Sequence, residues 1–128
     1  MASRLLELHL PVTNRLLITA VLSCSAVLPK GAVVINEIHH DPDIKTELAE
    51  FIELHNSGDE PANLSGWTIG GAVVYTIPEG TQLDGGAFAV IAHNPTQFRD
   101  KFGGSPLGPW LGKLDNDGER IELREATG

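Results

Sequence analysis

The chain has 128 residues, with 17 acidic and nine basic side chains and a formal charge of −8. That length predicts a single domain with a modest core. The acidic balance excludes a protein that coats DNA or RNA, because such a protein needs clustered lysine and arginine. The single cysteine excludes a disulfide framework and a cysteine-based zinc site. Fourteen glycines and eight prolines favour short strands over long helices.

Residues 1–26 are predicted to be a secretory signal peptide. Arg4 and Arg15 precede an apolar run from Leu16 to Leu28, which is shorter than the roughly 20 residues that cross a bilayer. Small residues at Cys24 and Ala26 favour cleavage after Ala26. We therefore expect an exported mature domain over residues 27–128, in the cell envelope or outside the cell, with no membrane span left after cleavage.

Three alternatives stay open for the amino-terminal segment. Cleavage a few residues later is one, a helix buried in the mature domain is another, and lipid attachment at Cys24 is the third. Cleavage after Ala26 removes two of the nine basic and one of the 17 acidic residues, which leaves seven against 16 and a charge of −9.

The mature chain is predicted to be a series of short strands. Valine and isoleucine favour a strand over Ala32–Ile38, and period-two alternation favours one over Glu50–Asn56. The other expected strands are Ala62–Ile69, Ala72–Ile77, Ala87–His93 and Glu119–Arg124. Because both faces of Ala87–His93 are apolar, we place it at the centre of its sheet. Six or seven strands at roughly ten-residue spacing predict an all-β sandwich.

One short helix is expected in a long loop after the strand Ala87–His93. Asn94 is a good N-cap, Pro95 suits the first helical position, and Gly103 ends the helix. The loop then continues from Gly104 to Gly112.

Four residues are expected to serve the fold. Asn56 and Gly118 lie in tight turns, and Gly66 precedes Trp67 in a Leu-Ser-Gly-Trp sequence in which Trp67 is predicted to anchor the core. Trp110 lies in a loop rich in proline and glycine, and it is the candidate for an exposed contact.

Two short clusters contain metal-binding residue types. His39, His40, Asp41 and Asp43 follow the first strand, while Asp115, Asp117 and Glu119 look like the start of a calcium loop. Adjacent strand residues point to opposite faces, so His39 and His40 cannot easily share an ion. Position 12 counted from Asp115 is Ala126, where a calcium loop has glutamate. We predict no metal and no cofactor.

The carboxylates of Glu37, Glu50 and Glu53 lie in or beside strands that we expect to pair. Paired carboxylates can catalyse acid–base chemistry, but no nucleophile or phosphate-binding loop accompanies these. The sequence therefore predicts no catalytic residues and no evident small-molecule ligand. A calcium- or ligand-binding sandwich is the alternative, and a metal-dependent hydrolase is the third possibility.

Several motifs occur in the order of one known family. They are Ile35-Asn36-Glu37-Ile38, Phe51-Ile52-Glu53-Leu54-His55-Asn56, Asn63-Leu64-Ser65-Gly66-Trp67-Thr68-Ile69, Tyr75-Thr76-Ile77-Pro78, Leu83 with Gly85-Gly86, and Asn116 to Arg124. In this order the chain resembles the lamin tail domain from about Val33 to Gly128, and it looks like an exported bacterial branch, since no coiled-coil rod precedes it.

The resemblance implies an immunoglobulin-like β-sandwich with no catalytic residues. It also implies an interaction or anchoring role in a bacterial surface or secreted protein, with an unknown protein or cell-envelope partner. The family pattern usually continues into another strand. We therefore expect that residues 27–128 are the amino-terminal part of a longer protein, lack the last strand, and precede any catalytic domain.

Overall fold

The structure is a computed structural model that describes residues 32–40, 49–115 and 117–126. Within these residues the chain forms nine strands and one helix. Their bounds are β1 Val33–His39, β2 Phe51–Asn56, β3 Ala62–Asn63, β4 Thr68–Gly71, β5 Val73–Thr76, β6 Gln82–Leu83, β7 Phe88–Ala92, α1 Pro95–Phe102, β8 Leu111–Gly112 and β9 Ile121–Arg124. The predicted all-β class with one short helix is confirmed. The predicted signal peptide lies outside the described residues.

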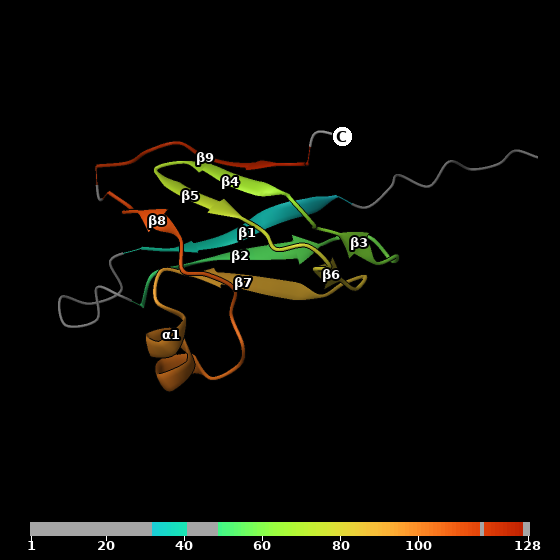
Figure 1. Ribbon diagram of the computed structural model, residues 1–128, viewed down its shortest axis with the longest axis horizontal. Coiled ribbons are helices and arrows are strands. Elements are labelled where there is room, and N and C mark those ends of the chain that lie inside the picture. The colour runs from blue at the N-terminus through green and yellow to red at the C-terminus, as the bar shows by residue number, and fades with distance from the viewer. Residues whose placement is uncertain (1–31, 41–48, 116, 127–128) are drawn as a thin grey trace, which may run out of the picture.

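Two antiparallel sheets form the layers of a sandwich. One has the strand order β1-β2-β7, and the other has the order β8-β5-β4-β9. In Figure 1 the strands β4, β5 and β9 make the upper layer, β2 and β7 lie in the lower layer, and α1 lies beneath it. The short β3–β6 ladder lies at the end of the sandwich away from α1. The outer faces of the two sheets therefore point in opposite directions.

The core lies between the two sheets and is made by alternate residues of each strand. β2 contributes Ile52 and Leu54, β4 contributes Ile69, and β5 contributes Val73. The other buried members are Leu64, Ile77, Leu83, Ile91, Trp110 and Leu114. Burial of these apolar side chains is the main force that holds the layers together.

The expectation that Ala87–His93 is the central strand is wrong. β2 lies in the middle of the three-stranded sheet, and β7 lies at its edge. The free side of β7 is paired with the returning loop, because the N–H of Ala92 donates to the carbonyl of Leu107 at 2.8 Å and the N–H of Leu107 donates to that of Val90 at 2.7 Å. Edge strands are often protected in this way, and here the cover is a loop rather than a strand.

Trp110 is buried where it was expected to be exposed, and Trp67 is less buried than Trp110. Trp110, expected to be exposed, is only 3% exposed and belongs to the core, where its ring stacks on that of His93 with centroids 5.6 Å apart. Trp67 is partly buried and packs against the core from its side. The physical reason is the same loop: by pairing with β7 it carries Trp110 back between the sheets.

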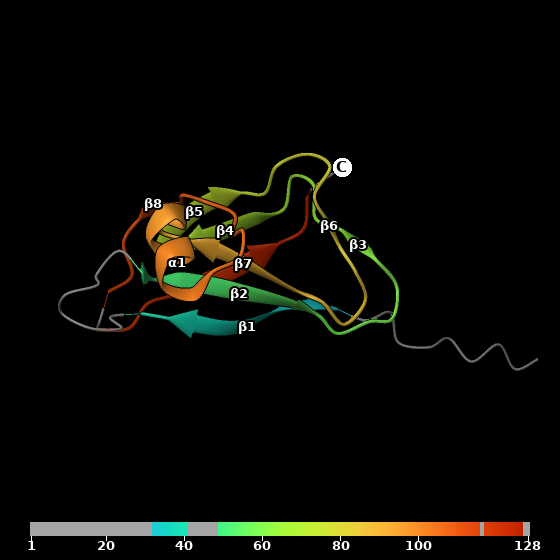
Figure 2. The same cartoon turned by 90° about the horizontal axis from the view of Figure 1, so that it is seen from below.

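The expected helix is confirmed as α1, and it covers part of one sheet. The side chain of Asn94 accepts hydrogen bonds from the N–H groups of Thr96 and Gln97, both at 3.1 Å, and Gly103 follows with φ +80°. Phe98 and Phe102 contact the ring of Phe51 on β2. Figure 2 shows α1 in front of one end of the three-stranded sheet.

Asn56 is a fully buried polar residue at the end of β2. Its side-chain amide donates to the carbonyls of Glu60, Leu83 and Asp84 at 2.8, 3.0 and 3.2 Å, and its carbonyl accepts from the N–H of Gly58 at 3.1 Å. One side chain thus joins the turn after β2 to the end of β6 and the residue that follows it. Buried polar groups require such partners.

Candidate functional site

The histidine at the end of β1 packs against aromatic residues. His39 stacks on Phe51 with centroids 4.8 Å apart and meets the edge of Phe102 at 6.0 Å. Its Nδ1 lies 3.9 Å from a carboxylate oxygen of Glu37. His39 therefore helps α1 to cover the sheet. Asp41 and Asp43, the other candidates of this cluster, lie outside the described residues.

The second candidate cluster stabilises its own turn. The N–H of Asp115 donates to the carboxylate of Glu119, and the carboxylate of Asp115 accepts from the N–H of Asp117 at 3.2 Å. Gly118 has φ +87°, the conformation that its turn requires. These carboxylates therefore already bind backbone groups.

The structure brings parts of the two clusters to one cleft, which the sequence did not indicate. His40 lines a cleft of about 210 Å³ together with Ile38, Leu114, Asp115, Gly118, Glu119 and Ile121. His40, Asp115 and Glu119 are the titratable groups among these residues. Nevertheless, no group of three histidine, cysteine, aspartate or glutamate residues within the described chain has a geometry that could hold a metal ion.

The three carboxylates of the strand region do not form a catalytic set. Glu37 and Glu53 lie opposite each other on β1 and β2, and Glu53 accepts a hydrogen bond from the Asn36 amide at 2.8 Å. Glu50 lies apart, buried, with Oε2 3.7 Å from Nδ1 of His93. Neither arrangement includes a nucleophile with its own base, which covalent catalysis requires.

The outer face of the three-stranded sheet has an open end. Val34, His55 and Phe88 are neighbours in register across β1, β2 and β7. The rings of His55 and Phe88 stack with centroids 4.3 Å apart, yet Phe88 is 54% exposed and Val34 42%. We call these three residues the aromatic row. A large aromatic side chain on a sheet surface is a recognised contact group in interfaces.

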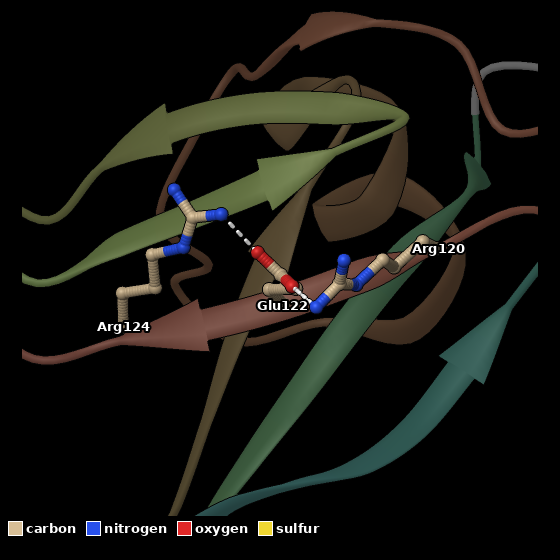
Figure 3. Close-up of polar contacts among 3 residues, drawn as sticks. All are labelled: Arg120, Glu122 and Arg124. Atoms are coloured by element: carbon tan, nitrogen blue, oxygen red, sulfur yellow. Dashed lines mark hydrogen bonds and ion pairs between the residues drawn. The ribbon is translucent and has the colours of Figure 1, made fainter.

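The outer face of the four-stranded sheet has a second exposed apolar pair. Val74 and Leu111 lie opposite each other on β5 and β8 and are 57% and 74% exposed. On the other side of this face, the carboxylate of Glu122 forms ion pairs with both Arg120 and Arg124 (Figure 3). We call Val74 and Leu111 the aliphatic pair.

Gly70, the first of the two glycines in β4, affects the shape of this second face. Gly70 lies opposite Glu122 in the ladder between β4 and β9. A Cβ placed at Gly70 would be 3.9 Å from the guanidinium of Arg124, so that guanidinium lies over the position without a side chain. The absence of a side chain at Gly70 therefore leaves room for this guanidinium beside its carboxylate partner.

The family comparison identifies the class of domain. The Lamin Tail Domain family matches residues 27–128, which is most of the chain. The chain belongs to the lamin tail domain family. Its fold is accordingly an immunoglobulin-like sandwich, and the family is a non-enzymatic domain typical of protein interaction. A search of curated proteins found no match.

The helix content of the structure bears on whether the chain crosses a membrane. No helix within the described ranges is both long and apolar enough to span a bilayer. The helix α1 has eight residues, far from the roughly 20 that a spanning helix needs.

Sequence reasoning missed the two exposed apolar groups. Val34, His55 and Phe88 come from strands far apart in the chain, and only the register of β1, β2 and β7 makes them neighbours. One local signal was present: Phe88 alternates with Ala89 and therefore had to face away from Ala89 and the core. Which face α1 would cover could not be read from that alternation.

Proposed function

We propose that the chain is a non-catalytic interaction module of an exported bacterial protein, held in the cell envelope or outside the cell. The observation that carries the proposal is the pair of exposed apolar groups on the outer faces, the aromatic row and the aliphatic pair. Exposed apolar groups of this kind commonly mark contact surfaces.

Export is supported by the sequence of residues 1–26. Two arginines, a short apolar run and small residues before position 27 fit a cleaved leader. The family match begins at residue 27, which agrees with a domain that starts after such a leader.

The partner is proposed to be a protein or another component of the envelope, rather than a nucleic acid. The mature chain would have a charge of −9, so phosphate backbones would be repelled on average. Any catalytic activity of the parent protein is proposed to lie beyond residue 128.

The test has two arms on the full chain expressed in a bacterial host. Mass spectrometry should find the secreted form shortened by its first 26 residues, and the purified protein should show no phosphatase, esterase or glycosidase activity. An unprocessed cytoplasmic product would contradict export. A hydrolytic activity that is lost in Glu53→Gln would contradict the non-catalytic proposal, and Glu122→Gln, on the opposite face, serves as the matched control.

A further inference from the structure

The open end of the three-stranded sheet combines apolar and acidic groups. Beside the aromatic row runs a second row, in which Glu37, Glu53 and Val90 are neighbours in register. Glu37 and Glu53 are the carboxylates of these three strands, and like charges placed directly opposite destabilise a sheet. Within the chain, Glu53 accepts a hydrogen bond from the Asn36 amide and Glu37 lies 3.9 Å from Nδ1 of His39. A cationic group from a partner can add to these contacts, so this face is suited to a surface that is both apolar and basic.

The outer face of the four-stranded sheet has the complementary composition. Its aliphatic pair lies on β5 and β8. Its charged residues are Glu122 and Arg124 on β9 and Arg120 just before that strand, a local excess of one positive charge. The side chains of Arg120 and Arg124 are 83% and 66% exposed, whereas that of Glu122 is 19% exposed. A partner therefore meets mainly guanidinium groups here, and guanidinium pairs well with carboxylates.

The two faces cannot meet within one molecule. They are the outer sides of two sheets that pack through their inner sides, so they point away from each other (Figure 1). A second copy of the chain can place Arg120 and Arg124, at the outer face of its four-stranded sheet, against Glu37 and Glu53 on the three-stranded sheet of the first. Such contact would also cover the aromatic row with the aliphatic pair.

We propose that this chain associates head to tail with copies of itself, through the aromatic row and Glu37–Glu53 of one copy and the aliphatic pair and Arg120–Arg124 of the next. The proposal deepens the proposed function, on which it rests, by naming the partner as a second copy. Because the two contact surfaces differ, the interface is heterologous and leaves a free surface at each end. Contacts of this kind produce rings or open chains rather than closed two-fold dimers.

Two single substitutions block one surface each. Phe88→Asp puts a carboxylate among carboxylates on the first face, and Leu111→Asp puts one in the aliphatic pair of the second. Both residues are more than half exposed, so the fold should tolerate the change. Gln97→Asp on the exposed side of α1 adds the same charge outside both surfaces and is the matched control.

Sedimentation velocity of the full chain is the measurement. The wild type and Gln97→Asp should grow in mass as concentration rises, whereas each blocked variant alone should stay monomeric, with association weakened about 30-fold or more. An equimolar mixture of Phe88→Asp and Leu111→Asp should form 1:1 dimers and stop there, because only one intact pair of surfaces remains. Circular dichroism of each variant checks that the fold is retained.

Three outcomes would overturn the proposal without touching the proposed function. A wild type that is monomeric up to millimolar concentration would mean that the faces serve a different partner. Association that survives in one blocked variant alone would indicate a two-fold contact or one made by other residues. A mixture that remains monomeric would show that the two surfaces do not bind each other.

Discussion

The outer face of the three-stranded sheet has one covered end and one open end. At the covered end Phe51 and Ala92 are buried beneath Phe98 of α1. At the other end of the same strands Phe88 remains 54% exposed, with its ring stacked on that of His55. The strands and their alternation are the same at both ends. The difference is that the chain after β7 folds back over one end only.

This comparison indicates which apolar residues serve stability and which are free for contact. Phe98 of α1 is buried against the sheet, and Trp110 of the following loop is buried in the core. That loop also pairs with the edge of β7. Phe88 and Val34, by contrast, remain 54% and 42% exposed. Substitutions at the covered end should therefore change the free energy of unfolding, and those at the open end should change association.

The largest effect is expected at the covered end, for Trp110→Ala. Emptying this buried site should lower the free energy of unfolding by about 3–5 kcal/mol. Urea denaturation measures this loss, and Trp67→Ala is the matched control. Because Trp67 is only partly buried, Trp67→Ala should lower the free energy of unfolding by about 1–2 kcal/mol. A larger loss for Trp67→Ala than for Trp110→Ala would reverse the assignment of the two tryptophans.

The next largest effect is expected for Asn56, the buried residue at the end of β2. Asn56→Ala leaves buried carbonyl groups without their donor and should cost about 1–3 kcal/mol. Asn56→Asp keeps the acceptor for the N–H of Gly58 but loses the donors, so it should not restore stability. Urea denaturation measures the change. If Asn56→Ala unfolds at the same urea midpoint as the wild type, the amide does not hold these turns together.

A smaller loss of stability is expected when the N-cap of α1 is removed. Asn94→Ala removes the N-cap of α1 and should cost about 1 kcal/mol, while Asn94→Asp should cost much less because it keeps an acceptor. Hydrogen exchange should be faster in α1 than in β2 of the Asn94→Ala protein. Equal acceleration in both elements would mean that the helix and the sheet open as one unit.

The smallest stability change is expected at the open end. Phe88→Ala should alter the free energy of unfolding by no more than about 0.5 kcal/mol, because the side chain is already largely in solvent. The same protein should associate less than the wild type. A loss of stability comparable to that of Trp110→Ala would place Phe88 in the core and remove the contrast between the two ends.

The locally encoded parts of this structure could be predicted from the sequence. The alternation in Glu50–Asn56, the cap at Asn94 and the glycine after Phe102 all depend on neighbours in the chain, and each predicted its element. The position of β7 could not be predicted, because its free side is paired by Leu107, a partner supplied by a loop that gave no strand signal. The burial of Trp110 follows from the same pairing.

The contact surfaces depend on register, which no single segment specifies. Glu37 faces Glu53 only after a bulge shifts the pairing of β1 with β2 between Ile35 and Glu37. Likewise, Val74 and Leu111 meet because β8 adds to the edge of β5, after a loop whose proline and glycine content predicted irregular chain. The family resemblance predicted the sandwich, but it did not indicate which side chains the outer faces of this chain present.

The most direct test of binding between the two outer faces is side-chain NMR of the full chain, recorded over a series of protein concentrations. If the two outer faces bind each other, the ring resonances of Phe88 and the methyl resonances of Val34, Val74 and Leu111 should shift or broaden together as concentration rises. The methyl resonances of the buried Ile52 and Ile91 should stay in place. Resonances that do not change at any concentration, or changes confined to one face, would contradict the claim that the two outer faces bind each other.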